Sequence, residues 1–231
     1  MRPVEHENLL VSPSLPMNLV IWRLSIFVML AGLAVFVTFA ALRAISESWI
    51  NDDFPEALAV KLELLPFIFP VHMIAGGLSL VLVPLALALR GTRFHRWAGR
   101  VAAIDIVVAG LTAIPVALEQ PVTRISAAGF TAQALTWMVL LGFGIWHIRH
   151  RRIAKHRVFM LLVAAVTSGA LFFRINLALW NVVGEGRHFK IFYACDAWVA
   201  WMFPLIIMAL LIKFGGLKNL WPKAAASTNP A

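Results

Sequence analysis

The chain has 231 residues, of which 61% are hydrophobic and only 13% are charged, and its mean hydropathy is +0.84. Soluble domains usually carry about 25% charged residues, so this composition excludes an ordinary water-soluble domain. The net charge of +9 does not indicate nucleic-acid binding, because the positive residues lie in short turns between apolar segments and not on one basic face.

The chain begins with a polar, proline-containing arm (residues 1–17), followed by six apolar segments. Each segment is long enough to cross a bilayer, for which about 20 helical residues suffice. Because lipid offers no hydrogen bonds to the backbone, every span is predicted to be a helix. The sequence thus predicts an all-α transmembrane domain over residues 18–213 and a tail over 214–231. The expected spans cover residues 18–42, 64–89, 98–118, 127–147, 157–183 and 191–213.

Lysine and arginine are concentrated in two turns. The turn after the second span has four arginines, the turn after the fourth has five basic residues, and neither contains an acid. The opposite turns mix basic residues with most of the acids. Because basic turns remain on the cytoplasmic side, both termini of the six-helix bundle are predicted to be cytoplasmic, and the lipid bilayer is the expected partner.

Ionisable side chains inside the spans are the first candidates for function, because each costs about 2.5–3.5 kcal/mol at bilayer depth. The helical rise places His72, Arg174 and Asp196 at similar depth in the outer half. An Arg174–Asp196 ion pair is expected, since a lone buried guanidinium is costlier than a paired one. Together with Gln133 and Asn176 they form either an outward-facing polar pocket for a ligand or a structural clamp between the last two spans.

Histidines also gather at the cytoplasmic ends of the spans, where His95 opens the third span and His156 opens the fifth. Histidines at one level, surrounded by arginines, indicate ligands for a haem iron and partners for its propionates. The alternative is that all of them are interfacial residues whose arginines reach lipid headgroups. The arginines concerned are Arg96, Arg100 and Arg157.

The two His-Arg pairs lie 61 residues apart, and the same shift carries His72 onto Gln133. Either chance or a relation between the two hairpins accounts for this spacing. Asp105, one to two turns into the third span, is expected to pair with a basic residue.

Hydrolytic and acyl-transfer catalysis are not supported, because the chain has no nucleophile motif, no glycine-rich phosphate loop and no His-Glu-x-x-His helix. The single Cys195 cannot form an intramolecular disulfide and is interpreted as a packing residue. A metal site without haem, built from His147, His150 and His156, is a further alternative.

The pattern resembles a family of predicted bacterial membrane proteins known as domain of unknown function 2306. The resemblance rests on His72 with Gly76, on the run His-Arg-Trp-Ala-Gly-Arg at 95–100, on His-Arg-Val-Phe-Met at 156–160 and on Arg174. It extends over about residues 20–213. It implies a multi-helix bundle in the bacterial cytoplasmic membrane and no established activity.

More loosely, the bundle is similar to haem-carrying cytochrome b-type proteins, in which histidines of neighbouring helices hold haem. An inner haem would use His95 and His156, whereas an outer haem would need Met202 or His188 opposite His72. The resulting expectation is a membrane redox protein that uses haem b, or is linked to quinone, and has a redox partner. The alternatives are a non-catalytic transporter, receptor or sensor that binds a small ligand in the polar pocket, and an assembly subunit.

Overall fold

The structure, a computed structural model, describes residues 56–184 and 187–215. This part of the chain consists of helices and contains no strand. The helices are α2 (Glu56–Leu64), α3 (Ile68–Ala88), α4 (His95–Leu118), α5 (Arg124–Arg149), α6 (Ile153–Val183) and α7 (Phe189–Lys213). Helices α3 to α7 are each long and apolar enough to cross a membrane. They confirm five of the six predicted spans. The first span (18–42), the arm (1–17) and residues 216–231 of the tail lie outside the described residues.

The apolar segment predicted as one span from residue 64 is divided into α2 and α3. Pro66 lies in the turn between them. A proline disfavours the helical conformation of the residue before it and lacks a backbone N–H, so α3 begins only at Ile68. The start of α5 is marked by a capping box, in which Thr123 and Ser126 each accept the other's backbone N–H.

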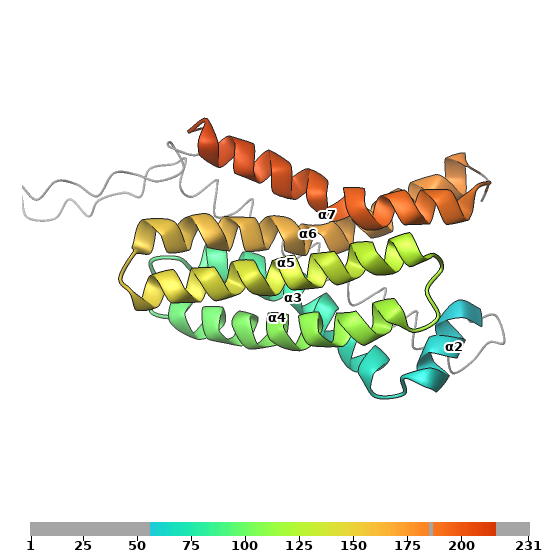
Figure 1. Ribbon diagram of the computed structural model, residues 1–231. Coiled ribbons are helices and arrows are strands. Elements are labelled where there is room, and N and C mark those ends of the chain that lie inside the picture. Colours follow the sequence, from blue (N-terminus) through green and yellow to red (C-terminus); the bar gives the residue numbers. More distant parts are fainter. Residues whose placement is uncertain (1–55, 185–186, 216–231) are drawn as a thin grey trace, which may run out of the picture.

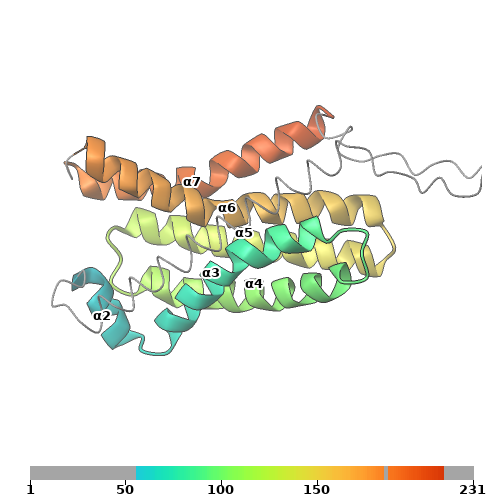
Figure 2. The same cartoon turned by 180° about the vertical axis from the view of Figure 1, so that it is seen from behind.

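Helices α3 to α6 form a closed ring of four. Helix α3 packs on α4 and α6, and α5 packs on the same two helices, so α4 and α6 stand at opposite corners (Figures 1 and 2). Each helix contributes one residue to a buried apolar layer at the centre, which consists of Val83, Ile106, Leu141 and Val163. This layer divides the interior of the ring into two halves.

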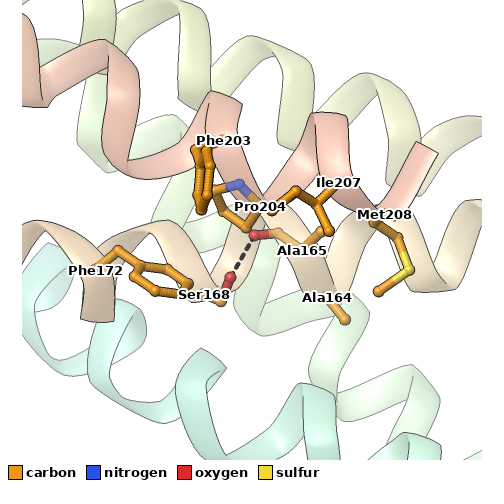
Figure 3. Close-up of a pocket in the computed structure, with 8 residues that line it drawn as sticks. All are labelled: Ala164, Ala165, Ser168, Phe172, Phe203, Pro204, Ile207 and Met208. Carbon is orange, nitrogen blue, oxygen red and sulfur yellow. Dashed lines mark hydrogen bonds between the residues drawn. The ribbon is translucent and has the colours of Figure 1, made fainter. Parts of the chain in front are cut away.

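Helix α7 lies outside the ring, against α5 and α6, and its second half diverges from α6 (Figure 1). Pro204 lies near the middle of α7, where its missing N–H and its clash with the preceding turn favour a bend. The divergence leaves an open groove of about 330 Å³ between α6 and α7 (Figure 3). No charged side chain lines the groove, and the Ser168 hydroxyl donates to the Ala165 carbonyl within α6.

Helix α2 is tied to the end of α4. Lys61 Nζ donates to the carbonyl oxygens of Val116 and Glu119, at 2.8 and 2.6 Å. Both carbonyls belong to the last turn of α4 or its cap, where no partner within the helix is available. Partial burial lowers the pKa of Lys61, and the nearby Glu119 carboxylate opposes that shift.

Candidate functional site

Two of the predicted histidines face the axis of the four-helix ring. His95 precedes the central residue Ile106 by eleven positions, and His156 precedes Val163 by seven. Both spacings return to nearly the same face of a helix. Because α4 and α6 stand at opposite corners, His95 and His156 point toward the axis from opposite sides. They lie at the end formed by the α3–α4 and α5–α6 turns, called the basic end below.

Both histidines are held in the same way. His95 Nδ1 lies 2.8 Å from the Ala86 carbonyl oxygen of α3, and His156 Nδ1 lies 2.9 Å from the Gly144 carbonyl oxygen of α5. A carbonyl only accepts, so Nδ1 carries the hydrogen of each of these bonds and Nε2 is the ring nitrogen left for another partner. Such anchoring of one ring nitrogen is typical of histidines that bind a metal through the other. In the described part of the chain, no hydrogen-bond partner is recorded for either Nε2.

The interior is open beside His95. Gly99 lies one turn further along α4, on the axis side, and a Cβ added there would meet no atom within 4 Å.

The arginines at the basic end do not all surround the two histidines, as the sequence suggests. Arg90 lies in electrostatic range of Arg157, and burial together with that charge lowers the pKa of Arg90. Three arginines are exposed on the flanks of α4 and α6 and do not face the axis: Arg96, Arg100 and Arg157.

The opposite half of the ring also contains two axis-facing ionisable residues. His72 precedes Val83 by eleven positions, and Arg174 follows Val163 by eleven, so each lies about 16 Å from the central layer. His72 Nδ1 lies 3.2 Å from the Ala109 carbonyl oxygen, and its ring is in electrostatic range of Arg174. Arg174 faces the same axis, and part of its side chain is exposed.

The structure does not bring the five residues of the predicted polar pocket into one cluster. Asp196 is 4% exposed, and its Oδ1 accepts from Asn176 Nδ2 at 2.7 Å. Arg174 instead donates to the Ala170 carbonyl oxygen of its own helix, at 2.8 Å. Arg174 and Asn176 are two positions apart, which places them on opposite sides of α6. The expected Arg174–Asp196 ion pair is therefore not formed among the described residues.

Gln133 takes a third position. Its Nε2 lies 3.4 Å from the Val166 carbonyl oxygen of α6. It thus links α5 to α6, as His72 links α3 to α4. At the basic end, His95 links α4 to α3 and His156 links α6 to α5. Each of the two hairpins is therefore linked across its helices at the same two positions. This agreement favours a relation between the hairpins over chance as the origin of the 61-residue spacing.

Asp105 has a hydroxyl partner in place of the basic residue expected from the sequence. Ser79 Oγ donates to Asp105 Oδ2 at 2.5 Å, and Ser79 is fully buried. Ser79 follows His72 by seven positions and shares its face of α3. This heptad spacing is the signal in the sequence that would have identified Ser79 as part of the α3–α4 contact.

The remaining candidate ligands lie elsewhere. Met202 belongs to α7, which packs outside the ring, on the far side of α6 from α3. His188 is exposed and precedes α7 with a left-handed backbone. In the described ranges, no group of three or more histidine, cysteine or acidic side chains is placed to hold a metal ion. The expected alternative of a metal site at His147, His150 and His156 is therefore not supported.

We expect Asn176→Leu to destabilise the fold by about 1–3 kcal/mol, because Asn176 donates to the buried Asp196 carboxyl group, whose second oxygen has no partner within residues 56–184 and 187–215. The double variant Asn176→Leu/Asp196→Leu should recover much of this loss, since both polar partners are then gone. Thermal unfolding of the purified protein in detergent measures the effect. Equal losses in the single and double variants would contradict the assignment.

Comparison with known proteins gives a match to one family. Searches among curated proteins and among solved structures give no match. The model of a family described as "Predicted membrane protein (DUF2306)" matches residues 69–212, which cover α3 to α6 and nearly all of α7. The described part of the chain contains five helices that are long and apolar enough to span a membrane, and the chain belongs to this family of predicted membrane proteins.

Proposed function

We propose that this protein is a membrane redox protein that holds haem b between His95 and His156. The observation that carries the proposal is the pair of axis-facing imidazoles at opposite corners of the ring, each anchored through Nδ1. The donor set would fit the group, because an imidazole that is held through Nδ1 offers Nε2 to an iron. Open space at Gly99 supports the fit.

The residues of this chain have separate roles in that function. The backbone carbonyls of Ala86 and Gly144 fix the tautomer and orientation of the two rings. The apolar central layer separates the two halves of the interior and excludes water between them. The arginines of the basic end, although they lie on the flanks of α4 and α6, would supply positive charge to balance the propionates. Haem, when bound, supplies one-electron exchange, and the redox partner we expect is a quinone in the bilayer or a protein.

The direct test is the absorption spectrum of the full chain, purified after expression with added haem precursor. We expect a Soret band and, after dithionite reduction, the sharp visible bands of a haem with two histidine ligands. A protein that is folded, as judged by gel filtration and thermal unfolding, and that shows no Soret band would refute the proposal.

A second candidate function is the binding of an anionic small molecule in the half of the ring that contains His72. It is favoured by Arg174, which faces the ring axis and for which the described residues provide no acidic partner. A charged side chain at bilayer depth is costly and usually marks a substrate or ion pathway. A transporter, receptor or sensor would use the guanidinium to hold a carboxylate or phosphate.

We expect succinate to raise the unfolding temperature of the wild type, because a ligand that binds only the folded state stabilises it. Arg174→Gln should abolish this increase. Arg124→Gln is the control. It removes one positive charge at the same end of the bundle, from a residue that does not face the ring axis, and should leave the increase in unfolding temperature unchanged. A variant Arg174→Gln that lowers the unfolding temperature but keeps the response to anions would identify Arg174 as a structural residue.

A further inference from the structure

The hairpin of α5 and α6 is strongly and uniformly positive. No aspartate or glutamate occurs between residues 120 and 184. The turn at the basic end contains five basic residues within nine positions, namely Arg149, Arg151, Arg152, Lys155 and Arg157. This turn lies where α5 and α6 reach the end of their membrane-spanning length. The positive charge in this hairpin is therefore not balanced by any acid of its own.

His147 is buried at this turn. The residue is 7% exposed, and among the described residues its Nδ1 has no hydrogen-bond partner. The ring lies against Trp146 and against Phe159 of α6, with centroid distances of 4.7 and 5.2 Å. Buried polar atoms are almost always paired, and an exception calls for a physical explanation. The other histidines of this end, His95 and His156, bond to backbone carbonyls.

The charged side chains near the His147 ring are positive. Lys155 and Arg152 lie in electrostatic range of it, and the rings of His150 and His156 are also nearby. Helix α6 starts beside it at Ile153, with no side-chain cap and no acid in its first turn. The free N–H groups and the dipole of a long helix favour an anion at such a position.

The side chains of Arg152 and His150 both pack on the Trp146 ring. The guanidinium of Arg152 lies over the Trp146 ring, 5.1 Å from its centroid. The His150 ring lies 4.5 Å from the same indole and is bonded through Nδ1 to the Trp146 carbonyl oxygen. Arg152 is thus held by an aromatic face next to the first turn of α6, where its donors remain available to a ligand.

We propose that the α5–α6 turn is a phosphate-binding site, in which a phosphate group lies between His147 and the first turn of α6 and accepts hydrogen bonds from His147, Arg152 and Lys155. A phosphate offers several acceptor oxygens and negative charge to a site whose charged side chains are all positive. The position at the end of the spans makes the headgroup of an anionic phospholipid one source. Free phosphate from the solvent is the other.

The test uses the full-length protein in detergent and native mass spectrometry with added phosphatidylglycerol or phosphatidylcholine. We expect phosphatidylglycerol to be retained by the wild type and to bind about tenfold more weakly to His147→Phe and to the double variant Arg152→Gln/Lys155→Gln. Phenylalanine preserves the ring contacts of His147 but removes its nitrogens. The control Arg96→Gln/Arg100→Gln removes two charges from the other basic turn and should retain the lipid.

The same variants are then unfolded thermally with inorganic phosphate in place of lipid. Stabilisation of the wild type by phosphate, lost in both site variants, and no preference for phosphatidylglycerol would assign the site to free phosphate. Equal losses in the site variants and the control would show attraction by charge alone and overturn the proposal. Retention of neither ligand by the wild type would also overturn it. Because the two site variants change different residues, misfolding of one leaves the other as the test.

Discussion

Haem content should fall at least tenfold when either His95 or His156 is replaced by leucine. Even removal of a partner that only orients a metal ligand typically weakens metal binding by about 10–100-fold, and these variants remove a proposed ligand itself. Both residues must be present, because the rings face the same axis from opposite corners of the ring. The Soret absorbance per mole of purified protein measures the effect.

His72→Leu is the matched control, since it removes an axis-facing histidine from the other half of the ring with the same kind of backbone bond. We expect it to keep the wild-type haem content. If the wild type binds haem and all three variants retain it, His95 and His156 are not the ligands. If His72→Leu alone loses haem, the cofactor lies in the other half of the interior.

Gly169→Val should be the most destabilising single change in the packing between α6 and α7, costing on the order of 3 kcal/mol or more. A Cβ on Gly169 would lie 2.6 Å from Trp201 Cβ and 2.9 Å from Trp201 Cα. The second of these atoms belongs to the backbone, so a side-chain rotation does not relieve the clash and the two helices must separate. Thermal unfolding in detergent measures the loss.

Gly142→Val is the control for this substitution, because a Cβ on Gly142 would meet no atom within 4 Å. Both variants place the same β-branched residue inside a membrane-spanning helix. The difference between the unfolding temperatures of the two variants therefore isolates the destabilisation caused by the clash with Trp201. Similar unfolding temperatures for the two variants would show that α6 and α7 are not packed through Gly169.

Much of the architecture follows directly from the sequence. Five of the predicted spans correspond to α3 to α7, because a helix that crosses hydrocarbon requires a long uninterrupted apolar run, which is visible without any knowledge of packing. The placement of the ionisable residues along the membrane normal also follows, since the rise per residue is constant. His72 and Arg174 were expected at similar depth, and both lie eleven positions from the central layer.

The sequence did not determine which polar residues meet across the bundle. In a span that is apolar on all sides, no stripe of polar residues marks the face that points inward, so only packing decides the neighbours of each residue. The closed ring of α3 to α6, with α7 outside it, places Asp196 beside Asn176 and directs Arg174 toward the axis. The same arrangement sets His95 and His156 at opposite corners, a relation that no spacing along the chain predicts.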